Sequence, residues 1–215
     1  MHAITNIFSE KDFKKICNLL TKKDKHLSDI IVKYGYPPFW SRPATFQSLI
    51  LFILEQQVSL ASAYAAFTKL KEKIAKVTPA RILQLTDKEL KACYFSRQKI
   101  VYAKELAIAV KTKKVNLSKH PTMTDEAIHK EMISVKGIGN WTVDVYLMHC
   151  QQRSDLFPLG DIALVNSMKE VMKLSKETNK EEMLLIAEKW RPHRTIASMI
   201  LWHSYIKKRN IKIQG

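Results

Sequence analysis

Apolar residues recur every three or four positions along almost the whole chain, which is the spacing of one face of an α-helix. No stretch alternates between apolar and polar residues for long enough to indicate a β-sheet. Ser and Thr precede many of the apolar segments, as helix N-caps do; Thr45, Thr86 and Ser96 are examples. These features predict an all-α fold of roughly eleven short helices.

The chain carries 36 Lys and Arg residues against 20 Asp and Glu residues, which gives a formal net charge of +16 and a pI near 9.7. Such an excess in 215 residues favours a polyanionic partner, of which nucleic acid is the most common. The basic residues are spread along the helices and not gathered in a tail. A surface charge that only maintains solubility is therefore the alternative interpretation.

The three cysteines, Cys17, Cys93 and Cys150, lie far apart and form no CxxC pair, as expected of reduced thiols in a reducing compartment. No zinc or iron-sulfur pattern is present. No apolar run approaches the ~20 residues of a membrane span, and the first ten residues lack the features of an export signal. We therefore expect a cytoplasmic, nucleoid-associated monomer without a membrane partner.

Only five glycines occur in the chain, and Gly137 and Gly139 lie two positions apart between two helical segments. Glycine tolerates positive φ, so we expect both residues to adopt it in a tight turn with an exposed main chain. The amides of this turn, the free N–H groups of the next helix and the charge of Lys136 would together suit a DNA phosphate. A plain corner between two helices has the same pattern.

Residues 135–142 read Val-Lys-Gly-Ile-Gly-Asn-Trp-Thr, which resembles the helix-hairpin-helix of the HhH-GPD superfamily of DNA glycosylases. Further segments follow in the order seen in the 3-methyladenine DNA glycosylase II (AlkA-like) branch, at residues 53–59, 95–99, 157–161 and 190–202. The resemblance extends from Phe39 to Tyr205. Several motifs in one order make the resemblance specific.

The resemblance implies a single glycosylase unit over residues 1–215, made of two helical lobes with a cleft between them. Residues 40–155 would contain the helix-hairpin-helix lobe, and residues 1–39 would pack with residues 156–215 as the second lobe. We expect no separate N-terminal β domain. The cysteine cluster of the endonuclease III-like and adenine-specific relatives is missing, so we expect no iron-sulfur cluster.

Asp161 stands directly before a helical segment whose apolar stripe includes Ile162, Val165 and Met168. An Asp at this place is ordinarily a helix N-cap. The resemblance instead identifies Asp161 with the catalytic aspartate of the superfamily. An alkylated purine carries a positive charge that weakens its glycosidic bond, so one carboxylate can stabilise the cationic sugar and orient or deprotonate water.

Bifunctional members of the superfamily carry a lysine nucleophile two residues after the second glycine of the hairpin. Trp141 occupies that position here. The resemblance therefore implies a monofunctional enzyme of base excision repair, which flips alkylated bases of the 3-methyladenine and 7-methylguanine type out of double-stranded DNA. It would hydrolyse the N-glycosidic bond and leave an abasic site.

The resemblance also implies a pocket for the flipped base. Trp141 and Trp202 would line it, with Trp40 and Tyr36 as weaker candidates, although each Trp could instead be part of the core. Gln57 takes the position of the wedge side chain that fills the gap in the duplex, where many relatives have Leu. Glu55 is either a second acid of the pocket or a hydrogen-bonded turn residue.

Contacts with DNA phosphates are expected from two segments of the chain. The hairpin would contribute Lys136, Gly137, Gly139 and Thr142, and the helix capped by Ser96 would contribute Arg97 and Lys99. A solvated helix face is the alternative for Lys99. Arg194 would support the active-site end of the last helix.

The resemblance requires no cofactor, but it implies a structural Na⁺ or K⁺ in the hairpin, bound by the main-chain carbonyls of Ile133, Val135 and Ile138. Two other functions stay open on the sequence alone. One is a glycosylase for another class of lesion, and the other is a non-catalytic helix-hairpin-helix DNA-binding module.

Overall fold

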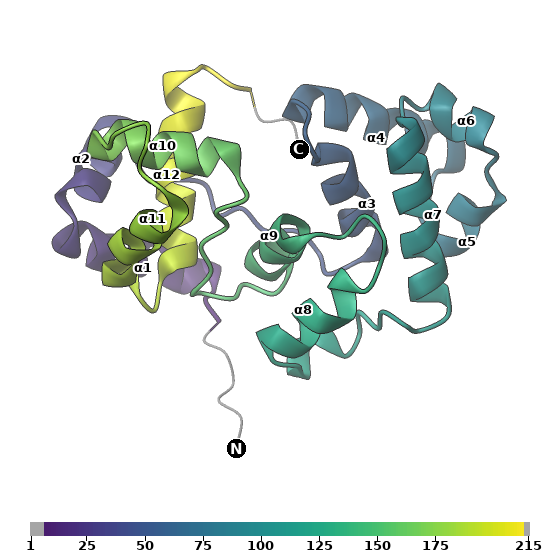
Figure 1. The fold of residues 1–215 in the computed structure, drawn as a ribbon, viewed down its shortest axis with the longest axis horizontal. Coiled ribbons are helices and arrows are strands. Elements are labelled where there is room, and N and C mark those ends of the chain that lie inside the picture. Colours follow the sequence, from purple (N-terminus) through teal and green to yellow (C-terminus); the bar gives the residue numbers. More distant parts are fainter. Residues whose placement is uncertain (1–6, 213–215) are drawn as a thin grey trace. The chain divides into compact units, whose positions relative to one another are not determined.

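The computed structural model describes residues 7–212, and these residues form helices joined by short loops (Figure 1). Within this part of the chain there are twelve α-helices and two short 3-10 helices, and β-structure is limited to one isolated bridge between Ile7 and Arg153. The predicted all-α fold is confirmed. No helix of the described residues is both long and apolar enough to cross a membrane.

The chain divides into two compact units. Unit 1 consists of residues 7–41 together with residues 147–211, and unit 2 consists of Arg42–Tyr146. The sequence placed the second boundary after residue 155, whereas the structure places it inside helix α9 (Asn140–Cys150). This helix follows the glycine turn. Its residues up to Tyr146 belong to unit 2, and its residues from Leu147 belong to unit 1.

Unit 1 is organised around helix α12 (Arg194–Lys208), which packs against α1, α2 and α10. Every residue of α12 from Thr195 to Ser204 is buried. A helix that is buried on all sides lies in the centre of a core and not at its surface. The other helices of this unit are α1 (Glu10–Lys23), α2 (Lys25–Tyr34), α10 (Ile162–Met172), α11 (Lys180–Ala187) and η2 (Glu188–Trp190).

Unit 2 contains α7 (Arg97–Lys111), which packs against α3, α5 and α6. Helix α3 also packs against α4. The remaining helices of this unit, besides the start of α9, are α3 (Phe46–Glu55), α4 (Leu60–Ile74), α5 (Pro79–Gln84), α6 (Asp87–Ala92), η1 (His120–Thr122) and α8 (Asp125–Ile133). The N-caps expected at Thr45, Thr86 and Ser96 are confirmed, since each side chain accepts a hydrogen bond from a main-chain amide in the first helical turn.

A buried histidine joins the two helices that flank the glycine turn. The ring of His120 is fully buried, and its Nδ1 lies 2.7 Å from the hydroxyl of Tyr146 on α9. Its Nε2 lies 2.8 Å from a carboxylate oxygen of Glu131 on α8. The same oxygen of Glu131 accepts a 2.7 Å hydrogen bond from the amide of Asn116. These contacts fix α8 against α9 and so restrict the geometry of the turn between them.

Candidate active site

Asp161 is held by two hydrogen bonds at one of its carboxylate oxygens. Its Oδ1 accepts the amide of Leu164 at 2.8 Å, which makes Asp161 the N-cap of α10. The same Oδ1 accepts the indole N–H of Trp202 at 2.9 Å. The ordinary cap geometry is therefore present, but the second donor comes from another helix and fixes the rotation of the carboxylate.

The residues before Asp161 place its side chain at the start of α10. The amide of Asp161 donates to the carbonyl of Pro158 at 2.9 Å, so the chain turns sharply immediately before α10 begins. Such a turn ends with a side chain at the start of the helix, where the helix dipole favours a negative charge. Asp161 is only partly buried, so solvent reaches it.

Trp202 belongs to a group of aromatic side chains in unit 1. The imidazole of His149 stacks on the indole of Trp202, with ring centroids 5.7 Å apart and planes 23° apart. The Nδ1 of His149 lies 3.2 Å from the main-chain oxygen of Trp40. The ring of Trp40 lies 6.4 Å from that of His203 on α12. Trp202 therefore contacts Asp161 directly and is linked through His149 to the main chain of Trp40; no signal in the sequence pointed to His149.

Trp202 and Tyr36 occupy environments that the sequence did not predict. Trp202 is 9% exposed and its N–H is used by Asp161, so it positions the carboxylate as well as lining its surroundings. Tyr36 donates its hydroxyl to Asn18 of α1 at 2.6 Å, and the ammonium of Lys14 lies 5.8 Å from its ring centre. These contacts attach Tyr36 to α1, so the structure gives no support for a place in the base pocket.

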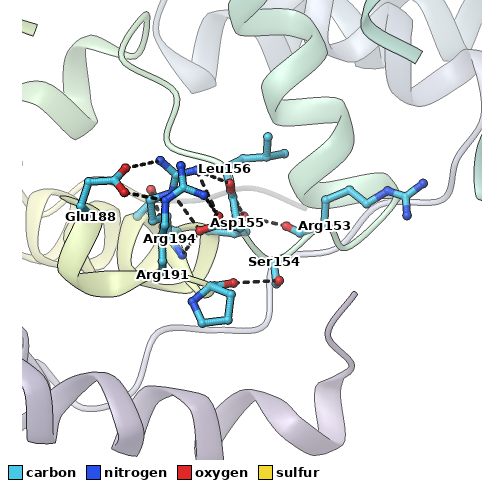
Figure 2. A network of polar contacts seen from close by, with 10 residues as sticks. Arg153, Ser154, Asp155, Leu156, Glu188, Arg191 and Arg194 are labelled. Carbon is cyan, nitrogen blue, oxygen red and sulfur yellow. Dashed lines mark hydrogen bonds and ion pairs between the residues drawn. The ribbon is translucent and has the colours of Figure 1, made fainter. Parts of the chain in front are cut away.

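Arg194 is the first residue of α12 and binds the segment that leads toward Asp161 (Figure 2). Its guanidinium donates to the carboxylate of Asp155 at 2.8 and 3.1 Å and to the main-chain oxygen of the same residue at 2.9 Å. Arg191 donates to Asp155 at 2.7 Å and to Glu188 at 2.7 Å. The network ties residues 153–156 to the start of α12, as expected of a residue that supports this end of the helix.

The glycine turn in unit 2 depends on Gly137 much more than on Gly139. Gly137 has φ of +93°, and a Cβ atom at this position would overlap the ring of Tyr102 on α7. Gly139 has no positive φ, and a Cβ atom there would meet nothing within 4 Å. The prediction that both glycines adopt positive φ is therefore wrong for Gly139. Its open surroundings leave the main chain accessible beside the exposed Lys136.

The side chain of Gln56 holds the glycine turn by hydrogen bonds, a role that was not predicted from the sequence. Its side-chain amide donates to the carbonyl of Gly137 at 2.9 Å and to the hydroxyl of Thr142 at 3.0 Å. Thr142 is 1% exposed. The hydroxyl of Thr142 is thus engaged inside unit 2, and the structure gives no support for its predicted contact with a phosphate.

Gln57, directly after Gln56, is exposed and has φ of +56° in the turn between α3 and α4. Positive φ is unfavourable for a residue with a Cβ atom, and such strain concentrates at functional positions. Arg97 is exposed in the first turn of α7, where the Ser96 side chain caps the amide of Lys99. Both residues therefore lie at the surface of unit 2, as the predicted contacts with DNA require.

Lys99 and Glu55 are engaged within unit 2. The ammonium of Lys99 donates to the carbonyl of Leu54 at 2.6 Å, and its burial lowers the pKa. It therefore closes the end of α3, and the structure does not support its predicted contact with a phosphate. Glu55 accepts two hydrogen bonds from the guanidinium of Arg42, at 2.6 and 2.8 Å. Of the two interpretations of Glu55, this pair supports the hydrogen-bonded turn residue.

The carbonyls expected to bind a monovalent cation lie at the end of α8 and in the turn. The oxygen of Val135 already accepts the amide of Ile138 at 3.0 Å, which leaves it a second lone pair. Lys114 donates to the carbonyl of Ser134 at 2.9 Å. The predicted ligands, the carbonyls of Ile133, Val135 and Ile138, are uncharged oxygen donors, and their binding of Na⁺ or K⁺ stays a prediction.

Trp141 and Asp144 are partly buried residues of α9, one helical turn apart. Burial raises the pKa of the Asp144 carboxyl to about 6, against the opposing effect of His129 on α8. Asp144 could not be recognised from the sequence, because nothing in the local pattern distinguishes it from a solvated helix residue.

The chain resembles proteins of one superfamily in sequence and structure. Residues 50–192 match the HhH-GPD superfamily of base excision DNA repair proteins. YfjP of Bacillus subtilis (strain 168), provisionally named a DNA-3-methyladenine glycosylase, is 32% identical over 213 residues, which are 95% of this chain and 74% of that protein. The alkylbase DNA glycosidase-like protein mag2 of Schizosaccharomyces pombe is 26% identical over 200 residues, 90% of this chain and 94% of that protein.

A solved structure extends the similarity to three dimensions. It is that of the Schizosaccharomyces pombe 3-methyladenine DNA glycosylase Mag1 in complex with abasic DNA, which superposes with a TM-score of 0.82 at 26% sequence identity. The similarity covers 94% of this chain and 99% of that one.

Proposed function

The chain belongs to the HhH-GPD superfamily of base excision DNA repair proteins, and we propose that it is a monofunctional DNA glycosylase for alkylated bases. Its substrates would be bases of the 3-methyladenine and 7-methylguanine type in double-stranded DNA. The enzyme would extrude the damaged base, hydrolyse its N-glycosidic bond and leave an abasic site.

The observation that carries this proposal is the fixed carboxylate of Asp161. Leu164 and Trp202 both donate to Oδ1, so the orientation of the group is set before any substrate arrives. A preorganised negative charge stabilises the oxocarbenium-like sugar as the bond breaks, and we assign this task and the orientation of water to the carboxylate of Asp161. The departing base already carries a positive charge, so little acid catalysis is needed.

The residue two positions after Gly139 supports a monofunctional reaction. Trp141 has no amine, so it cannot attack the sugar and form a Schiff base. An aromatic side chain at this place instead offers a surface on which a flipped base can stack, with a preference for a cationic one.

DNA would be bound through its phosphates and through a side chain inserted into the duplex. We assign phosphates to the open main chain at Gly139, to Lys136 and to Arg97, all at the surface of unit 2. Gln57 would occupy the gap left by the flipped nucleotide. A Na⁺ or K⁺ at the carbonyls of the turn would reduce the repulsion between the phosphate and those carbonyls.

Base release from methylated duplex DNA by Asp161→Asn tests the function. We expect the single-turnover rate to fall at least about 100-fold, because the neutral amide cannot stabilise the sugar cation. Asp29→Asn, which removes an exposed carboxylate of α2, serves as the control and should retain the parental rate. Equal release by the Asp161 variant and the parent would contradict the proposed mechanism.

The same assay separates this function from its two rivals. A glycosylase for another lesion would release a deaminated or oxidised base from defined duplexes while leaving methylated bases in place. A non-catalytic DNA-binding module would release no base from any duplex, although it would still bind DNA.

A further inference from the structure

The carboxylate of Asp144 lies on α9, the helix that follows the glycine turn. It is partly buried, and no hydrogen bond or ion pair is found for its side chain among the described residues. Among the described residues, His129 of α8 is the ionisable group that influences the charge of Asp144, and its Nε2 is 3.0 Å from the side-chain oxygen of Asn140. Partly buried carboxylates normally have donors, because lost hydration must be offset.

The burial has a measurable consequence for the charge of this group. The pKa of Asp144 is raised to about 6 by burial, and the opposing effect of His129 does not offset the rise. The carboxyl is thus still ionised at neutral pH, but its charged form is poorly stabilised by the protein. A cation beside Asp144 would stabilise the charged carboxylate. A neutral group would remove more of its hydration without offering an attraction in return.

The position of Asp144 indicates which cation this could be. Residues three apart on a helix lie on the same face, so the side chains of Trp141 and Asp144 are neighbours along α9. Both residues are partly open to solvent. A base stacked on the Trp141 indole would therefore lie within one helical turn of Asp144.

We propose that Asp144 is a specificity-determining residue that contacts the edge of the flipped base and selects bases that carry a positive charge. The proposal rests on the proposed function, in that Trp141 lines the base pocket. N-alkylation at N3 of adenine or N7 of guanine gives the purine ring a formal positive charge that the unmodified base lacks. Attraction to a poorly hydrated carboxylate discriminates between the two more strongly than attraction in water.

Equilibrium binding tests the proposal independently of catalysis. The probes are two duplexes, one with 2′-fluoro-7-methyldeoxyguanosine, whose fluorine slows cleavage of the glycosidic bond, and one with deoxyguanosine at the same position. We expect the parent to prefer the methylated duplex and Asp144→Asn to reduce this preference about tenfold. Glu105→Gln removes an exposed carboxylate of α7 in the same unit and should keep the preference of the parent.

Single-turnover excision provides the second readout, with 7-methylguanine as a cationic base and hypoxanthine as a neutral one. Asp144→Asn should slow the release of 7-methylguanine about tenfold and leave the release of hypoxanthine unchanged or faster. Asp144→Glu, which retains the charge, should keep most of the selectivity and controls for a disturbance of packing by Asn.

Two results would overturn the inference: an Asp144→Asn variant with the selectivity of Glu105→Gln, or one that slows both bases equally, as a structural residue would. A parent that releases no base but prefers the methylated duplex through Asp144 would contradict the proposed glycosylase activity alone.

Discussion

The indole N–H of Trp202 donates to the same carboxylate oxygen of Asp161 that caps helix α10. A tryptophan from the centre of unit 1 thus sets the orientation of the carboxylate to which we assign the chemistry. This contact ties the geometry of the candidate active site to the packing of α12, and it can be removed without deleting the aromatic ring.

Trp202→Phe keeps a ring but removes the N–H donor. We expect the single-turnover rate of base release to fall about tenfold, because the loss of a hydrogen bond to a charged acceptor costs roughly 1.5 to 3 kcal/mol and only part of it reaches the transition state. Affinity for undamaged duplex DNA should not change. Trp40→Phe, in the same aromatic group, is the control and should affect the rate less; a larger effect at Trp40 would argue against the assigned role of the indole N–H.

Gly137→Ala and Gly139→Ala differ by one methyl group from the parent and should behave very differently. At Gly137 the new Cβ would overlap the ring of Tyr102 at positive φ, so we expect a loss of about 2 to 4 kcal/mol in the free energy of unfolding. At Gly139 the Cβ meets open space, and the loss should stay below about 1 kcal/mol. Urea denaturation measures both; similar losses would contradict the described turn.

The affinity for undamaged duplex DNA should fall steeply as the salt concentration rises, because phosphate contacts release counterions. The double variant Lys136→Ala with Arg97→Ala should reduce the slope of log Kd against log salt concentration by about two, one for each lost phosphate contact. Lys22→Ala on α1 removes an exposed charge outside the assigned contacts and should leave the slope unchanged. A salt-independent affinity of the parent would refute phosphate binding altogether.

Asp144→Asn should stabilise the protein at neutral pH. The pKa is raised from 3.8 to about 6 in the folded protein, so between these values the folded state binds more protons than the unfolded state. The contribution of Asp144 to stability therefore falls as pH rises through this window, and it is lowest above pH 6. We expect a gain of about 1 to 2 kcal/mol for the variant at pH 7.5, allowing for partial exposure, and none at pH 3.5, as measured by denaturation at both pH values.

The helices and their starts could be predicted from the sequence because the signals are local. A Thr or Ser before an apolar segment needs only its own first turn to act as a cap, and the caps at Thr45 and Ser96 form as expected. Ser9 also stands before an apolar segment, but its hydroxyl donates to Asp12 and caps no amide. Asp161 could be found for the same local reason, since a motif and a helix start coincide there.

The partners of the polar side chains could not be predicted, because they come from distant parts of the chain. Lys99 donates to Leu54, 45 positions earlier, and Gln56 binds Gly137, 81 positions later. Nothing in the local sequence separates such a lysine from one that faces DNA. The burial of Thr142 could not be foreseen for the same reason, since it depends on packing that a motif does not encode.

The burial of α12 from Thr195 to Ser204 limits how this enzyme can diverge. A substitution there that reshapes the surroundings of Asp161 also changes the core of unit 1, so new substrate preferences acquired through this helix would be linked to losses in folding free energy. Trp141 and Asp144 on α9 are only partly buried, so substitutions there remove less core packing. Changes in lesion preference between relatives are therefore expected to accumulate at these partly exposed positions of α9, while the buried residues of α9 and α12 vary little.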